Sequence, residues 1–150
     1  MRVAFASDHA GFELKQFLLA AAGKLGYETL DAGALQYDAA DDYPDYAEAL
    51  GCAIRNGEAD RGVLICGSGV GASVAAAKMR GIRAAVCHDV YSAHQGVEHD
   101  DMNVIVLGAR IIGTELARDL MVAFLQAKFS EEPRHKKRLA KVASIEDRYS

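Results

Sequence analysis

In Val63-Leu-Ile-Cys-Gly-Ser-Gly-Val-Gly-Ala-Ser73, a short apolar segment runs into a glycine-rich turn and then into an alanine-rich segment. Residues 62–65 have the β-branched character of a buried parallel strand, and residues 70–79 have the composition of a helix. Glycines at the junction let the chain turn sharply and let backbone N–H groups approach an anion, which a helix N-terminus also attracts. The segment therefore predicts a strand–turn–helix unit that places Cys66 beside an anion-binding backbone.

Apolar segments and helical patterns alternate along the rest of the chain. The expected strands are residues 2–6, 27–30, 62–66, 83–87 and 103–107, and the expected helices are residues 14–25, 45–55, 70–79, 91–97 and 114–128. Right-handed crossovers place helices on both faces of a parallel sheet. This order predicts a Rossmann-like α/β fold, a three-layer α/β/α sandwich with a five-stranded parallel sheet. Pro133 begins a C-terminal helical extension over about residues 131–148, and residues 1–150 form a single domain.

The composition favours a globular protein with a small ligand. With 150 residues, of which 51% are hydrophobic and 25% charged, the chain can bury a core of its own. A net charge of −4 gives no general attraction to nucleic acid or to anionic membranes. The three cysteines lack C-x-x-C spacing, which fits a reducing compartment better than a disulfide framework or a zinc site. Because we also find neither a signal sequence nor a run of about 18 apolar residues, we expect a cytoplasmic protein.

Polar residues follow the expected strands, at the carboxyl edge where parallel α/β sheets bind ligands. Asp8 and His9 follow the first strand, Cys66 and the glycine turn the third, and Arg110 the fifth. Asp8 and His9 have a second interpretation that is as good as a role in ligand binding, namely an N-cap and a polar first helical turn. His99 precedes the fifth strand and belongs to the opposite, amino edge if the preceding helix is regular, so spacing leaves its placement open.

Cys66 has an ordinary interpretation as well as a chemical one. Most free cysteines are small buried hydrophobic residues. A helix N-terminus or a cation stabilises a thiolate, however, and makes the thiol a better base or nucleophile. Cys52, on a helix, and Cys87, in a strand, lack such a setting, so we expect both in the core. The histidines show no spacing typical of metal ligands, and no metal site is expected.

The glycine turn also fits a dinucleotide-binding pattern. Gly67-x-Gly69-x-x-Ala72 matches G-x-G-x-x-G/A, and Asp89 stands about 20 residues on, where a carboxylate for a ribose is expected. That pattern normally opens the first strand–helix–strand unit, whereas here it follows the third strand. A Walker loop is excluded because no Gly-Lys-[Ser/Thr] follows.

The basic run at 134–138 fits a solvated helix face, or a phosphate-binding site formed by two arginines four residues apart.

Several motifs in sequence order together resemble the type B ribose 5-phosphate isomerases, whose wider group also includes the subunits of galactose 6-phosphate isomerase. They are Ser7-Asp-His-Ala-Gly11, Asp42-Tyr-Pro44, Leu64-Ile-Cys-Gly-Ser-Gly-Val-Gly71, Gly81-Ile-Arg-Ala-Ala85, Glu98-His99, Asn103-Val104, Gly108-Ala-Arg110 and Arg134-His135. The resemblance covers essentially the entire chain. It implies an aldose–ketose isomerisation of a phosphorylated sugar, chiefly ribose 5-phosphate to ribulose 5-phosphate, through an enediolate and with no metal or organic cofactor.

The resemblance also implies roles for residues. Cys66 is the base, an assignment that Ala72 supports because another branch of the family has a catalytic glutamate there. Ser68 moves protons between the sugar oxygens, and His99 opens the sugar ring. The implied substrate-binding set is Asp8, His9, Gly67, Gly69, Val70, Gly71, Asp100, Arg110, Arg134 and Arg138. The implied active unit is a homodimer, or a tetramer, with each site between two subunits. Arg134 and Arg138 would then serve either their own site or the partner's site.

Asp100 departs from the asparagine that the family commonly has at this position. An ionised carboxylate cannot donate a hydrogen bond, and it repels a nearby anion. The substrate preference is therefore open. The alternatives are an isomerase of another phosphorylated sugar, such as an allose, galactose or tetrose phosphate, and a non-catalytic module that binds a dinucleotide or a sugar phosphate.

Overall fold

Five parallel strands form one sheet in the computed structural model, which describes residues 1–150. Their order is β2-β1-β3-β5-β4, with β1 (Arg2–Ser7), β2 (Glu28–Asp31), β3 (Arg61–Cys66), β4 (Ala84–Val86) and β5 (Val104–Gly108). Ser7 pairs with Ile65 and Cys66 pairs with Gly108, so the carboxyl ends of the three central strands meet at one edge. The predicted five-stranded parallel sheet is confirmed.

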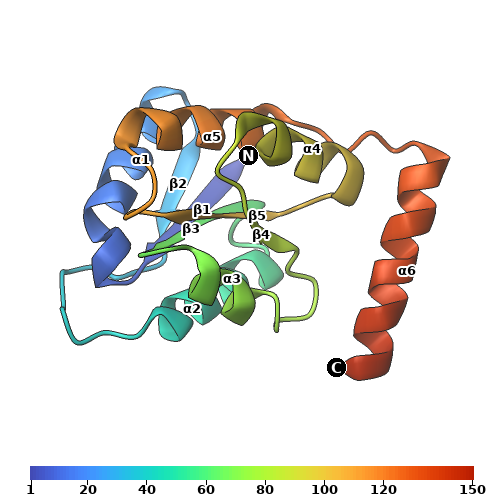
Figure 1. Ribbon diagram of the computed structural model, residues 1–150, viewed down its shortest axis with the longest axis horizontal. Helices are drawn as coiled ribbons and strands as arrows, with labels where there is room; N and C mark the ends of the chain where they lie inside the picture. The colour runs from blue at the N-terminus through green and yellow to red at the C-terminus, as the bar shows by residue number, and fades with distance from the viewer.

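Helices cover both faces of the sheet, as Figure 1 shows. One face carries α1 (Phe12–Lys24), α4 (Val90–Asp100) and α5 (Thr114–Gln126), and the other carries α2 (Tyr43–Arg55) and α3 (Val70–Ala76). A short 3-10 helix, η1 (His9–Gly11), links β1 to α1, and α6 (Pro133–Tyr149) ends the chain. The predicted three-layer sandwich with a C-terminal helix is therefore confirmed. None of these helices combines the length and the apolar character that a bilayer-spanning segment requires.

The two faces of the sheet are packed with side chains of different size. Along β1, Val3 and Phe5 join the core under α1, α4 and α5, while Ala4 and Ala6 join the core under α2 and α3. This alternation follows from the two-residue period of a strand. Cys66 belongs to the second core. Small alanines on this face let α2 and α3 lie close to the sheet.

Arg61, the first residue of β3, holds the end of α5. Its guanidinium donates to the carbonyl oxygen of Phe124 at 2.6 Å and to that of Ala127 at 2.8 Å. The last carbonyls of a helix have no partner within the helix, so this side chain supplies the missing donors. The contact joins the sheet to the C-terminal end of α5.

Replacing Arg61 with methionine is expected to lower the free energy of unfolding by about 2 kcal/mol, because two carbonyls lose a charged donor. Urea denaturation measures the change. Arg55 is exposed at the end of α2 and has no ion pair, so Arg55→Met should shift the free energy of unfolding by less than about 0.5 kcal/mol. Equal effects of the two substitutions would show that the contact with α5 contributes nothing.

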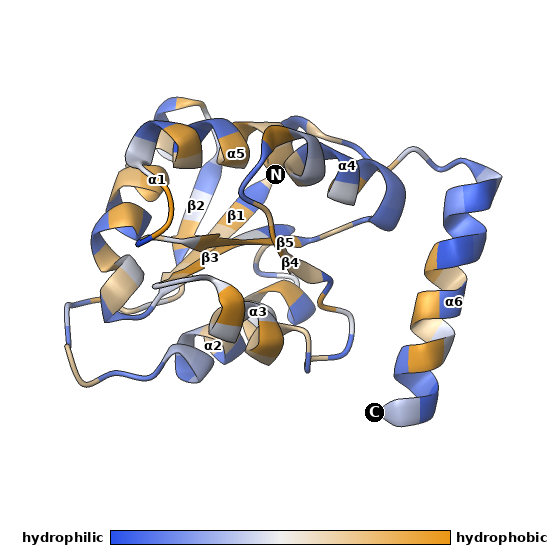
Figure 2. Ribbon diagram, in the orientation of Figure 1, coloured by the Kyte–Doolittle hydropathy of each residue, from blue (hydrophilic) through white to orange (hydrophobic).

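Helix α6 stands apart from the sandwich (Figure 1). Its beginning packs near α4, and its end is tied to the α3–β4 loop by an ion pair of 2.5 Å between Arg80 and Asp147. Between these two contacts, Val142 and Ile145 are about half exposed, at 53% and 51%. Figure 2 shows that α6 has apolar stretches between hydrophilic ones. The single chain thus leaves one apolar face of α6 uncovered.

Candidate active site

A cavity of about 330 Å³ opens at the carboxyl edge of the central strands. Its lining consists of Asp8, Tyr43, Cys66, Gly67, Ser68, Gly71, Arg110 and Ile111. Six of these residues are predicted site residues, and they come from the end of β3 and from the segments that follow β1, β3 and β5. Parallel strands that end at a common edge thus bring together side chains from distant parts of the sequence.

The Cys66 sulfur is held in place by the glycine turn. The N–H of Gly69 donates to Sγ at 3.2 Å, and the cysteine is only 4% exposed. Gly69 has φ 83°, a left-handed conformation that glycine adopts without strain. The turn that follows β3 therefore depends on glycine at this position to aim its amide at the sulfur.

Hydrogen-bond donors and a cation share the cavity with the sulfur. Ser68 Oγ accepts from the N–H of Val70 at 3.2 Å, so the hydroxyl proton remains available for donation. The N–H groups of Gly67 and Ser68 have no acceptor in the protein. Arg110 is exposed and has no ion pair, and its N–H donates to the Gly67 carbonyl oxygen at 3.0 Å. These groups together can bind an anion beside Cys66.

Asp8 both caps a helix and lines the cavity. Its Oδ1 accepts from the N–H groups of Ala10 and Gly11, at 3.0 and 3.2 Å, and so caps η1. Asp8 also lines the cavity. The cap fixes the carboxylate beside the site, because its position is set by the backbone of η1.

Tyr43 is a cavity residue that the sequence analysis did not single out. It is the first residue of α2, and its ring lies over Gly71, where an added Cβ would come within 2.6 Å of Tyr43 Cζ. The sequence signal was present in Asp42-Tyr-Pro44, but only as part of a resemblance. Val70, predicted to bind substrate through its backbone, is the first residue of α3 and lies outside the cavity lining.

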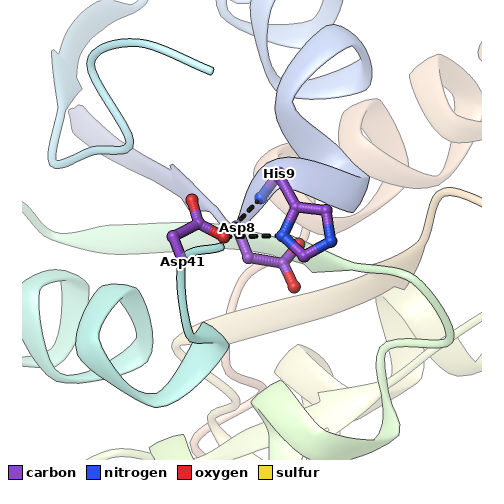
Figure 3. A group of neighbouring side chains, drawn as sticks. All are labelled: Asp8, His9 and Asp41. Carbon is purple, nitrogen blue, oxygen red and sulfur yellow. Dashed lines mark hydrogen bonds and ion pairs between the residues drawn. The ribbon is translucent and has the colours of Figure 1, made fainter. Parts of the chain in front are cut away.

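His9 forms a close pair with Asp41, a second residue that the sequence analysis did not single out (Figure 3). The backbone N–H and Nδ1 of His9 lie 2.9 and 2.7 Å from Asp41 Oδ1. The hydrogen bond to Asp41 outweighs burial and raises the pKa of His9. Burial alone would raise the pKa of Asp41, but the hydrogen bonds from His9 outweigh it and lower that pKa. The pair therefore favours a charged imidazolium and a charged carboxylate.

Asp8, His9 and Asp41 offer potential metal ligands within 4.8 Å of one another. Hydrogen bonds already occupy Nδ1 of His9 and one oxygen of each carboxylate. These bonds account for the arrangement, and we interpret the group as a hydrogen-bonded cluster.

His99 lies at the other edge of the sheet. Helix α4 ends three residues beyond its predicted end, so His99 stands in its last turn, close to the amino end of β5. The amide of Gln95 donates to His99 Nδ1 at 2.8 Å, which leaves Nε2 as the protonated nitrogen. The ring stacks on that of His135 with 4.0 Å between centroids. His135 is 2% exposed, and burial, with the nearby His99, lowers its pKa.

The single chain thus divides the predicted site between two edges of the sheet. The cavity at the carboxyl edge holds Cys66 and Ser68, whereas His99 and the exposed Asp100 lie at the amino edge. Besides Val70, four further predicted residues fall outside the cavity lining. They are Gly69, which donates to the Cys66 sulfur, His9, which lies beside Asp8, and Arg134 and Arg138, which are exposed on α6. Arg134 forms an ion pair of 2.7 Å with Glu132.

The other two cysteines have different surroundings. Cys87 is buried one residue beyond β4, as predicted for a core residue, and burial raises its pKa to about 11. The prediction of a core position for Cys52 is wrong, because Cys52 is exposed on α2. Leu50 and Gly51 lie on the buried face of that helix, and the next residue points about 100° away from Gly51.

Comparisons with known proteins cover almost the whole chain. The family described as Ribose/Galactose Isomerase matches residues 3–142. The chain is 43% identical over 147 residues to ribose-5-phosphate isomerase B of Escherichia coli, covering 98% of this chain and 97% of that protein. It is 39% identical to D-erythrulose-4-phosphate isomerase of Pectobacterium atrosepticum, over 86% of this chain and 85% of that one.

Solved structures agree with these sequence comparisons. Ribose-5-phosphate isomerase B of Clostridium thermocellum matches with a TM-score of 0.96 and 42% identity, covering 100% of both chains. Ribose-5-phosphate isomerase B of Mycoplasma genitalium, whose structure contains bound ribulose-5-phosphate, matches with a TM-score of 0.91 and 33% identity. That match covers 97% of this chain and 96% of the other.

Proposed function

Because this chain belongs to the ribose/galactose isomerase family of sugar-phosphate isomerases, we propose that it interconverts ribose 5-phosphate and ribulose 5-phosphate. The observation that carries the proposal is the cavity in which Cys66, free backbone N–H groups and Arg110 meet. Moving a carbonyl between C1 and C2 requires a base that removes a proton from one carbon and returns it to the other. Cys66 is the group in the cavity that suits this role.

The chemistry passes through an enediolate. The Cys66 thiolate takes the proton from C2 of the open-chain aldose, and the resulting thiol returns it to C1. The N–H groups of Gly67 and Ser68 hold the negative oxygens, and losing one such donor typically costs about 3 kcal/mol of barrier. The Ser68 hydroxyl passes a proton between the two sugar oxygens.

The remaining predicted groups act from a second subunit in this proposal. His99 and the α6 arginines lie at the edge opposite to the cavity, and α6 has an uncovered apolar face. A two-fold homodimer brings the same two surfaces together twice, so each cavity receives the partner's amino-edge groups. His99 would then open the sugar ring through Nε2–H, and the partner's α6 would bring two cations to the phosphate.

Adding a methyl group at Gly71 is expected to lower kcat/KM by about 10- to 100-fold, because it pushes the Tyr43 ring and misplaces the substrate. Steady-state kinetics measure the effect. The control is Gly23→Ala in α1, where no atom lies within 4 Å of the added methyl group. That variant should keep full activity and gain up to about 1 kcal/mol of stability. Normal kinetics in Gly71→Ala would remove Tyr43 from the proposed substrate pocket.

A second candidate function is the isomerisation of another phosphorylated sugar. The similarity to an erythrulose-4-phosphate isomerase supports it, as does Asp100 at a position where a neutral amide is common. The dinucleotide alternative loses its support, because the glycine turn follows the third strand and holds Cys66.

The deciding experiment measures kcat/KM for aldose–ketose conversion of ribose, allose, galactose and erythrulose phosphates without added metal. The highest value for ribose 5-phosphate would support the proposal. A higher value for another sugar would replace ribose as the substrate. Conversion of none of them would leave only a binding function.

A further inference from the structure

Asp41 is a buried acidic residue whose principal partner is His9, and the hydroxyl group of Tyr46 also acts on its carboxylate. Its side chain is only 6% exposed, and its Oδ1 accepts both hydrogen bonds from His9. Its other oxygen, Oδ2, is buried and has no hydrogen-bond partner. Burying a carboxylate is unfavourable unless a positive group compensates it. His9 is the cationic partner that the structure offers to this carboxylate.

The opposite end of the His9 ring is free. Nδ1 faces Asp41, while Nε2 has no partner in the protein on a side chain that is 28% exposed (Figure 3). Asp8, the preceding residue, lines the cavity, and so does Arg110, whose charge acts on His9. His9 therefore lies beside the cavity, within reach of the charge of the free guanidinium.

The charged groups around His9 come from three segments. Asp8 follows β1, Asp41 lies in the loop between β2 and α2, and Arg110 follows β5. The first two favour the protonated ring and the third opposes it. Tyr37 meets the ring edge-on at 6.3 Å and is the only aromatic neighbour. Asp41 is the only one of these groups that forms a hydrogen bond with the ring.

We propose that Asp41 is a positioning residue that holds His9 by Nδ1, so that a charged Nε2–H is presented to the substrate phosphate beside Arg110. This proposal rests on the proposed function in one respect, that the ligand carries a phosphate group. Two cations at one edge suit a dianion better than a neutral hydroxyl group.

The pair sets a pH window for phosphate binding. A phosphate monoester becomes a dianion above a pH of about 6. The raised pKa of His9 keeps the imidazolium charged to a higher pH than in a free histidine. The phosphate dianion and the His9 imidazolium therefore coexist mainly between these two limits. Removing the Asp41 charge lowers the upper limit and so narrows the window from above.

The first experiment follows the His9 ring nitrogens by NMR through a pH titration, in the full chain and without substrate. Asp41→Asn keeps an oxygen for Nδ1–H but removes the charge, and the His9 titration should move to lower pH. Asp45→Asn is the matched control, since it removes an exposed carboxylate four residues away that has no contact with His9. It should leave the titration unchanged.

Inorganic phosphate serves as the probe of binding. We expect it to perturb Nε2 of His9 in the original protein at neutral pH, and to bind about 10-fold more weakly to Asp41→Asn. Identical titrations and identical phosphate affinities in the two proteins would overturn the proposal. This result does not depend on turnover, so it is distinct from failure of every sugar phosphate to react, which would overturn the proposed function.

Kinetics separate positioning from mere structural support. With ribose 5-phosphate near pH 7, Asp41→Asn should raise KM about 10-fold and leave kcat within about 2-fold, and the two proteins should converge near pH 6. In a His9→Gln background, Asp41→Asn should have no further effect on KM. An additional loss of similar size in that background would show that Asp41 acts independently of His9 and would overturn the proposal.

Discussion

Replacing Cys66 with alanine is expected to lower kcat at least about 1,000-fold while ribose 5-phosphate still binds. The substitution removes the group that carries the proton between C1 and C2, but it leaves Arg110 and the free N–H groups in place. Stopped assays of both reaction directions measure kcat, and calorimetry measures binding. Near-normal turnover in Cys66→Ala would show that another group is the base.

The other two cysteines provide matched controls for the same experiment. Cys52 is exposed and should tolerate alanine, and so should the buried Cys87, with a smaller margin of stability. The high pKa of Cys87, about 11, makes it a poor target for alkylation. In a Cys52→Ala protein, an alkylating reagent should therefore inactivate the enzyme through Cys66, and ribose 5-phosphate should protect it.

Two inactive variants are expected to restore each other's activity when their subunits mix. Cys66→Ala lacks the base, and an Arg134→Ala/Arg138→Ala double variant lacks the cations on α6. In the proposed homodimer, a mixed pair contains one site with all its parts. At equal concentrations half of the dimers are mixed, so activity should return to about one quarter of that of the original protein. Activity of remixed subunits at saturating substrate is the measurement.

The matched control changes an arginine on the cavity side. Arg110 lines the same cavity as Cys66, so mixing Cys66→Ala with Arg110→Ala leaves every site defective. No recovery is expected from that mixture. If the α6 variant also fails to recover, although subunit exchange is demonstrated by mass spectrometry, each chain uses its own arginines and the interface arrangement is wrong.

The sequence predicts the sheet and the sulfur-containing half of the cavity because both depend on local patterns. Each strand is a short apolar run, and each strand end carries its polar residues on the next few positions. Parallel strands then bring those positions to one edge without further information. Asp8, Cys66 and Arg110 meet for this reason.

Tyr43 and Asp41 could not be found in this way. Their contacts depend on how the loop between β2 and α2 folds back over the strand ends, and no periodic pattern encodes that path. The placement of His99 needed the true end of α4, three residues beyond the predicted one. Helix ends are set by capping and tertiary contacts, which short-range hydrophobic spacing does not report.

The exposed face of α6 has a consequence for how activity scales with the amount of protein. A 17-residue helix with few contacts to its own chain gains little stability from its internal hydrogen bonds. In the proposed homodimer, mass action would both order this helix and complete the site. At concentrations below the dissociation constant of the pair, the turnover rate per volume would then rise with the square of the chain concentration. The concentration of the protein in the cell would thereby limit the rate of the reaction even when substrate is abundant.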